Sequence, residues 1–112
     1  MPVEKWSESV VILHLADDPQ FTDELEDLEE YAADGRPNAV LDFAGVHGIN
    51  SSNLARMLKL RKQTIQVGKR LILCNLGSHV LSTLLVTGLD NVFELSQDVS
   101  TALATLQLSA RA

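Results

Sequence analysis

The sequence predicts an α/β domain with a mixed, mostly parallel sheet of four to five strands and about four helices. Short apolar runs rich in β-branched residues alternate with amphipathic segments of helical periodicity, and the connections between them are short. Such alternation is typical of strand–helix–strand crossovers, which place helices over parallel strands. With 112 residues the chain is long enough for one core but not for two. We therefore expect 1–112 to form one domain, with 109–112 as a frayed tail.

The N-terminal part predicts two strands and one helix. Val10–Leu15 is apolar and β-branched and is expected to form a strand, with Val3–Trp6 as a short edge strand before it. Pro19 is well placed to open a helix. From Gln20 to Ala33 apolar residues recur every three or four positions among many acidic ones. The Gly-Arg-Pro segment at 35–37 is expected to stop this helix.

The middle of the chain predicts a strand, a turn and a helix in direct succession. Ala39–Phe43 is the strand, and a short loop with two glycines follows it. We expect the helix to run from Ser52 to about Val67, where Gly68 ends it. One side of this helix is expected to carry Leu54, Met57, Leu58, Arg61 and Ile65.

The C-terminal third predicts two more strands and two more helices. Leu71–Asn75 is almost wholly apolar, as is typical of a strand buried on both faces. Ser78 is expected to cap the next helix. Val92–Leu95 is a short last strand, and the final helix is expected to begin at Asp98 or Ser100.

Composition and charge argue against several classes of protein. The formal net charge is −6, which disfavours bulk attraction to nucleic acid or to an anionic membrane, so we expect no direct nucleic-acid contact. No apolar stretch approaches the length of a membrane span, so we expect no membrane insertion; the first residues also lack the order of a signal peptide. The single cysteine, Cys74, is expected to be a reduced, buried thiol in a cytoplasmic protein.

The residue types that usually carry catalysis are scattered. The sequence holds no glycine-rich nucleotide-binding loop and no metalloprotease or serine hydrolase motif. His14, His47 and His79 stand singly, so we interpret each as structural and not as a metal ligand. Cys74 would need an exposed position and an activating base to act as a nucleophile, and an enzyme using it or a histidine is the weakest hypothesis. We predict no enzyme activity, no cofactor and no metal site.

Residues 38–62 are the most informative stretch. An apolar strand ends there at the small polar cluster 50–53 (Asn-Ser-Ser-Asn), and an amphipathic helix begins at once. A serine at a helix start either caps free backbone N–H groups or carries a phosphate that those groups and the helix dipole favour. A capping role explains one hydroxyl better than two. The pair is therefore a candidate phosphorylation switch.

Charge is distributed unevenly along the chain. Acidic residues concentrate between Asp17 and Asp34, and basic residues between Arg56 and Arg70. Solvation alone can explain both groups. A basic helix directly after the serine turn is also a natural docking site for a partner protein.

The segment from Leu41 to Leu54 resembles the central motif of STAS domains, the family of bacterial anti-sigma factor antagonists. In that family an apolar-Asp-(Leu or Phe)-small-Gly-Val strand leads through an apolar residue to Asp-Ser-Ser-Gly-Leu at a helix start. Asn50 and Asn53 stand where the family has Asp and Gly. The segments 71–76 and 80–93 follow in the family's order, so the resemblance covers nearly the whole chain. The matching motif positions are Leu41, Asp42, Gly45, Val46, Ile49, Ser51, Ser52 and Leu54.

This resemblance implies regulation of sigma-factor-dependent transcription by partner switching. The unphosphorylated antagonist binds an anti-sigma factor that is itself a serine kinase of the histidine-kinase-like ATPase type, and a sigma factor is released. Phosphorylation separates the complex until a PP2C-type phosphatase restores the antagonist. Carried over by position, the phosphoacceptor is Ser51, and Ser52 is its neighbour and candidate cap. The residues expected to bind the partner are Asn50, Ser51, Ser52, Asn53, Arg56 and Lys59.

Two alternatives remain open at this point. The chain can be a STAS scaffold that is not phosphorylated and belongs to a larger signalling or transporter complex. Self-association into a homodimer is also compatible with the sequence.

Overall fold

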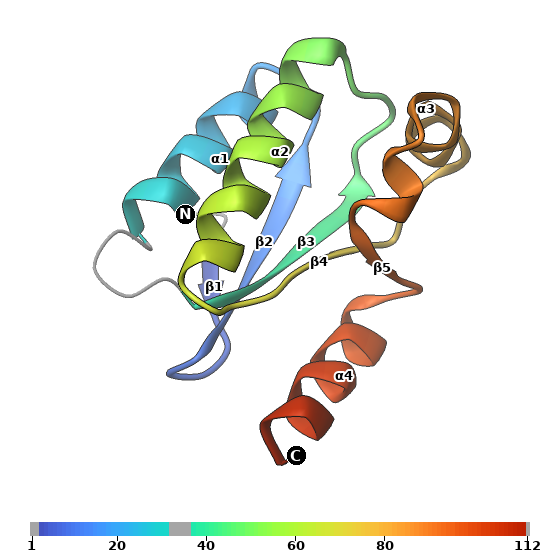
Figure 1. The fold of residues 1–112 in the computed structure, drawn as a ribbon. Coiled ribbons are helices and arrows are strands. Elements are labelled where there is room, and N and C mark those ends of the chain that lie inside the picture. Colours follow the sequence, from blue (N-terminus) through green and yellow to red (C-terminus); the bar gives the residue numbers. More distant parts are fainter. Residues whose placement is uncertain (1–2, 32–36, 112) are drawn as a thin grey trace.

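Five strands form one mixed sheet, and helices cover both of its faces (Figure 1). The computed structural model describes residues 3–31 and 37–111. The strand order is β1-β2-β3-β4-β5, with β1 antiparallel to β2 and every other pair parallel. The elements are β1 (Val3–Lys5), β2 (Val10–Ala16), α1 (Gln20–Tyr31), β3 (Asn38–Gly45), α2 (Ser51–Gln66), β4 (Leu71–Cys74), α3 (Ser78–Thr87), the 3-10 helix η1 (Leu89–Asn91), β5 (Glu94–Ser96) and α4 (Val99–Arg111).

This arrangement confirms the predicted α/β class and the mixed, mostly parallel sheet. The expected edge strand is present as β1, at the outer side of β2. The expected end of the first helix near Ala33 and its stop at residues 35 and 36 lie outside the described residues, as does Ala112. The last helix is described as far as Arg111, within the segment that we expected to fray.

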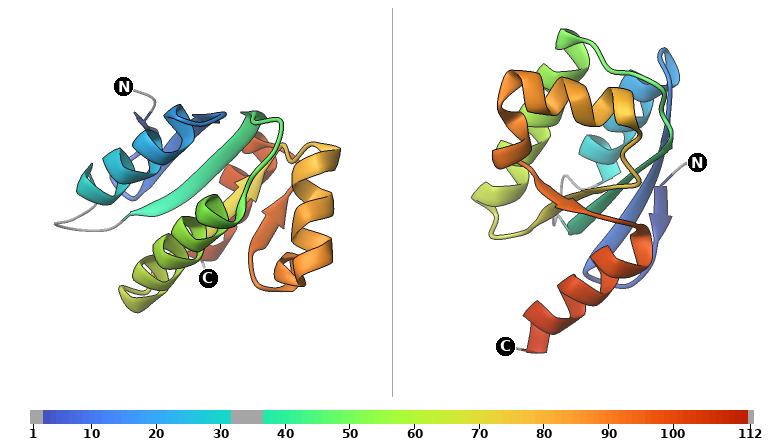
Figure 2. Two further views of the ribbon diagram at one scale, coloured as in Figure 1. Left: turned by 90° about the horizontal axis from the view of Figure 1, so that it is seen from above. Right: turned by 90° about the vertical axis from the view of Figure 1, so that its right-hand side faces the viewer.

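The two faces of the sheet bury different sets of side chains. Leu13, Leu41 and Leu73 point toward α1, α2 and α3 and belong with residues of these helices to the larger core cluster. The alternate residues of the same strands, such as Val40 and Ile72, pack with apolar residues of α4. The right-hand view of Figure 2 shows α4 apart from the other helices. Because both faces of the central strands are covered, these strands are continuous apolar runs in the sequence.

The close approach of β2 and β3 at their carboxyl ends requires a glycine. The register shifts between His14 and Ala16, and Ala16 then pairs with Gly45. A β-carbon at position 45 would lie 2.8 Å from the backbone oxygen of Leu15, a distance that real β-carbons do not tolerate. Gly45 thus fixes the point at which the chain leaves the sheet toward α2.

The buried side of α2 differs from the expected one. The helix buries Asn53, Leu54, Met57, Leu60 and Thr64. Leu58 and Ile65, which we expected on this side, are 37% and 48% exposed. Positions 53, 57, 60 and 64 are spaced as one helical stripe against the sheet, and residues 58 and 65 lie at its open edge.

Two other boundaries were wrong by a few residues. Gly77, not Ser78, is the N-cap of α3, and it makes no side-chain cap. The last strand begins at Glu94 because the chain first makes η1, and the N–H groups of Val92 and Phe93 both donate to the carbonyl of Leu89.

Candidate functional site

The serine pair lies at the carboxyl end of the parallel sheet, where α2 begins. β3 ends at Gly45, and the loop that follows is anchored by buried Val46 and half-buried Ile49. Ser51 and Ser52 are the first two residues of α2, and both are exposed. The loop therefore holds the serines at the surface by burying the apolar residues before them.

Asn50, and not a serine, caps α2. Its backbone is extended, with φ −109° and ψ 178°, and its side-chain oxygen accepts a hydrogen bond of 2.8 Å from the N–H of Asn53. The side-chain oxygen of Asn53 accepts in return from the N–H of Asn50, at 3.0 Å. This reciprocal pair is a capping box. The expectation that Ser52 is the cap is wrong, because the last extended residue before the helix is Asn50.

Because Asn50 caps α2, neither serine hydroxyl is needed for capping. Within residues 3–31 and 37–111, neither the Ser51 nor the Ser52 hydroxyl makes a hydrogen bond. The first backbone N–H groups of a helix have no partner within it, and they carry the positive end of its dipole. An anion attached to Ser51 would therefore meet a favourable local environment.

Asn53 points into the molecule and not toward a partner. It is 3% exposed, and its amide nitrogen donates a 2.8 Å hydrogen bond to Asp18 Oδ2. The other oxygen of Asp18 accepts from the N–H and hydroxyl of Thr22. Hydrogen bonds from Asn53 and Thr22 hold the pKa of Asp18 below its ordinary value. Asn53 thus links the starts of α1 and α2, and its expected role in partner contact is wrong because it is buried.

A second aspartate from the same turn also holds the serine loop. Asp17 accepts from the backbone N–H of His47 at 2.8 Å, and His47 Nδ1 lies 2.7 Å from its second oxygen. These contacts lower the pKa of Asp17, with the hydrogen bond from the His47 side chain as the largest cause. In the sequence, Asp17 and Asp18 directly precede Pro19, and neither was expected at the serine site. The preference of aspartate for capping and turn positions was a signal of this role.

The predicted cations lie along the exposed part of α2. Arg56 is half-buried and forms an ion pair of 3.0 Å with Glu26 of α1. Lys59 is exposed, and among the described residues it has no ion-pair partner. Five of the six predicted contact residues therefore reach the surface at or near the start of α2: Asn50, Ser51, Ser52, Arg56 and Lys59.

Asp42, the carboxylate of the central motif, belongs to a separate polar cluster on the α4 side of the sheet. One oxygen lies 2.7 Å from His14 Nδ1, and the other accepts from Asn75 Nδ2 at 2.9 Å and from the N–H of Ala44. Glu4 of the edge strand contacts the second ring nitrogen of His14 at 3.2 Å. His14 and His47 thus each have a carboxylate partner that their spacing in the sequence did not reveal. Asp42 joins the ends of β2, β3 and β4.

The electrostatics of this cluster favour an ion pair. The hydrogen bond to Asp42 raises the pKa of His14 despite the opposing effect of burial. Partial burial acts to raise the pKa of Asp42, but hydrogen bonds from Asn75, Ala44 and His14 outweigh it and lower the pKa. At mildly acidic pH both groups are charged, and the ion pair links β2 to β3 near their carboxyl ends.

Cys74 is fully buried, and its thiol donates to the carbonyl of Leu41 at 3.5 Å. Burial raises the pKa of this thiol to about 12, so it is protonated at neutral pH and is a poor nucleophile. In the part of the chain that the structure describes, no group of three or more His, Cys, Asp or Glu residues is placed to hold a metal ion. None of the described helices is long and apolar enough to cross a bilayer.

Comparisons with known proteins agree with this fold. A family model described as STAS domain matches residues 8–102. Similar solved structures include TM1081 of Thermotoga maritima, assigned as an anti-sigma factor antagonist (19% identity, TM-score 0.83, 95% of this chain and 93% of that chain). A serine-to-glutamate variant of Moorella thermoacetica RsbS has 16% identity and a TM-score of 0.84 over 99% of this chain and 97% of that one.

The anti-sigma factor antagonist SpoIIAA in its unphosphorylated form is also similar, with 14% identity and a TM-score of 0.73 over 94% of this chain and 96% of that one. At these identities the likeness establishes the fold. No curated protein sequence matches the chain significantly.

Proposed function

Because the chain belongs to the STAS domain family, we propose that it is an anti-sigma factor antagonist that phosphorylation of Ser51 switches off. Its partner is an anti-sigma factor that is also a serine kinase of the histidine-kinase-like ATPase type, and a PP2C-type phosphatase reverses the switch. Structural similarity to proteins named as anti-sigma factor antagonists supports this role. The function places the protein in the cytoplasm.

One observation carries the proposal: Ser51 is exposed at the first position of α2, and Asn50 has already supplied the cap. A phosphate on Ser51 adds about −1.5 to −2 charges beside the free N–H groups of the first turn. The fold should accept this group because it displaces no existing hydrogen bond of the hydroxyl. The change would then act on the partner and not on the stability of the domain.

The partner contact that phosphorylation weakens lies on the exposed part of α2 and its cap. Its residues are Asn50, Ser51, Ser52, Arg56 and Lys59. A doubly charged group in the middle of a desolvated contact opposes binding through its hydration and through any carboxylate that the partner presents there. A coupling free energy of about 1–3 kcal/mol corresponds to roughly 5–150-fold in affinity. That range is sufficient to exchange partners at constant protein concentration.

Phosphate transfer is the direct test. The full chain is incubated with ATP and with recombinant serine kinases of the histidine-kinase-like ATPase type from the same genome, and any phosphate is mapped by mass spectrometry. We expect modification of Ser51, its loss in Ser51→Ala, and its retention in the matched control Ser52→Ala. The PP2C-type phosphatase should remove the group.

Binding to the same kinase provides the second measurement. By calorimetry, Ser51→Asp should bind the kinase roughly 5–150-fold more weakly than the unmodified chain does. The NMR amide spectrum of the variant should still be that of the folded domain. An unmodified Ser51 together with undiminished binding of Ser51→Asp would refute the switch and favour the unregulated scaffold.

A further inference from the structure

The second half of the molecule carries a basic region that extends beyond the surface of the serine switch. No acidic residue occurs in the sequence between Asp42 and Asp90, although the whole chain has a net charge of −6. Six of the nine Lys and Arg residues lie in this interval: Arg56, Lys59, Arg61, Lys62, Lys69 and Arg70. Positive charge is therefore concentrated on α2 and on the connection from α2 to β4.

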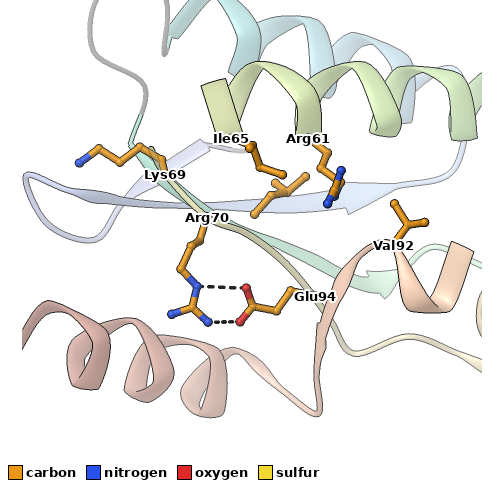
Figure 3. A pocket seen from close by; sticks show the side chains of 7 residues that line it. Arg61, Ile65, Lys69, Arg70, Val92 and Glu94 are labelled. Carbon is orange, nitrogen blue, oxygen red and sulfur yellow. Dashed lines mark hydrogen bonds and ion pairs between the residues drawn. The ribbon is translucent and has the colours of Figure 1, made fainter. Parts of the chain in front are cut away.

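A pocket of about 170 Å³ lies at the far end of this region, between the last turns of α2, the start of β4 and β5 (Figure 3). Ile65, Leu71 and Val92 form its apolar lining. At 1.5 Å per residue along α2, Ile65 is roughly 21 Å from Ser51. The pocket and the serine site are thus separate surfaces at opposite ends of one helix.

Two cations besides Arg70 line this pocket. Among the residues that the structure describes, neither Arg61 nor Lys69 forms an ion pair. Arg61 and Ile65 reach from α2 toward Val92, whereas Lys69 extends outward from the other end of the pocket (Figure 3). Arg70 is different, because two of its nitrogens bind both oxygens of Glu94 and this ion pair forms one wall. The pocket therefore combines an apolar lining with the positive charges of Arg61 and Lys69.

The dimensions and exposure of the pocket suit one aliphatic side chain. Its volume is similar to that of an engineered cavity of about 150 Å³ that admits benzene. Ile65, on its lining, is 48% exposed, so an inserted group would cover apolar surface that is now in contact with water. A highly charged anion such as nucleic acid fits less well, because the Glu94 carboxylate lies in the wall.

We propose that this pocket docks an acidic segment of a partner protein, with one aliphatic side chain between Ile65, Leu71 and Val92 and flanking carboxylates facing Arg61 and Lys69. The argument for this partner is charge complementarity at an apolar site. The contact is independent of the state of Ser51, so it goes beyond the proposed function and gives the molecule a second point of attachment.

The test uses the full chain labelled with ¹⁵N and the peptide acetyl-Glu-Asp-Leu-Asp-Glu-amide. We expect saturable shifts confined to amides of residues 61–71 and 92–94, which weaken as salt is added because the contact is partly electrostatic. A peptide with Gly in place of Leu should bind at least tenfold more weakly, since it loses the buried side chain. Ser51→Asp should bind the original peptide as the unmodified chain does.

Adjacent residues of α2 provide a matched pair of variants. Arg61→Glu should reduce peptide affinity at least fivefold, and Lys62→Glu, which makes the same charge change outside the pocket, less than twofold. The amide spectrum of each variant reports whether it is folded. If a variant unfolds, the comparison of the Leu and Gly peptides on the unmodified chain still decides the matter.

Four outcomes would overturn the proposal. They are the absence of saturable shifts at several millimolar peptide, equal affinity of the Leu and Gly peptides, the same shifts with inorganic phosphate alone, and self-association in sedimentation experiments that Arg61→Glu abolishes. The third would indicate a simple anion site, and the fourth a second copy of the chain as the occupant. Because Ser51 is unchanged in these measurements, failure here leaves the serine switch intact.

Discussion

Asn50 and Asn53 form the cap of α2, so the hydroxyls of Ser51 and Ser52 have no capping role. The reciprocal hydrogen bonds of the two asparagines satisfy the backbone N–H groups of Asn50 and Asn53, an arrangement whose loss typically costs about 1 kcal/mol. The motif that the sequence resembles has Asp and Gly at these positions. Here the asparagines keep the turn, and the buried amide of Asn53 brings the Asp18 carboxylate to the start of the helix.

The pair formed by His14 and Asp42 makes a pH-dependent contribution to stability. The folded-state pKa of His14 is raised, so its contribution is complete below the unfolded value near 6.5 and is lost as pH rises through the folded value. The pKa of Asp42 is lowered, so its contribution is complete above an unfolded value near 3.8 and is lost as pH falls through the folded value. The pair therefore stabilises the fold most between these two limits.

We expect His14→Gln to lower the free energy of unfolding more at about pH 5.5 than at about pH 8.5, measured by urea denaturation. His14 carries a positive charge, and so attracts the Asp42 carboxylate, only at the lower pH. In an NMR titration, His14 should show a midpoint above 6.5, and Asp42→Asn should bring that midpoint down. An identical effect of His14→Gln at both pH values would contradict this assignment.

At the scale of the element, α2 contributes to three separate surfaces. Its first turn presents the serines, its buried stripe packs on the sheet, and its last turns form part of the basic pocket. The exposed Leu58 and Ile65 are not part of the core, and Ile65 lines the pocket. A helix of 16 residues is long enough, at about 24 Å, to keep its two ends independent.

This division predicts unequal costs for two leucines of α2. Leu60 is 2% exposed, so Leu60→Ala should lower the free energy of unfolding by about 2–5 kcal/mol. Leu58 is 37% exposed, and Leu58→Ala should cost less than about 1 kcal/mol because little packing is lost. Urea denaturation of both variants at one pH provides the comparison. Similar costs would mean that the buried stripe has been assigned to the wrong residues.

At the scale of the whole molecule, α4 completes the core by covering the second face of the sheet. Ala102 and Leu106 of this helix pack with Val40, Ile72 and Cys74. Without that cover, the apolar residues on this face of the central strands would meet water. Cys74 therefore reports on the attachment of α4 to the sheet.

We expect the Cys74 thiol to be almost inert toward an aromatic disulfide reagent in the native protein. It is 0% exposed, and its raised pKa of about 12 leaves little thiolate. Its reaction rate should rise steeply in urea, in parallel with the loss of helical circular dichroism. Rapid labelling without denaturant would instead show that α4 detaches from the sheet on its own.

The sequence by itself determined the order and type of the elements and the location of the serine turn. Periods of two and of three to four residues are local properties, and they distinguish strands from helices without knowledge of the fold. The apolar runs at β3 and β4 also indicated burial on both faces, as the structure has it. The motif around Ser51 then identified the family that the chain belongs to.

The tertiary structure alone decided which polar residues meet. Asp18 contacts Asn53 across 35 positions of the sequence, Asp17 contacts His47 across 30, and His14 contacts Asp42 across 28. Such pairs depend on how β2, β3 and α1 come together, which no local period records. The same is true of the orientation of α2, where a rotation of one residue position, about 100°, separates the core from solvent.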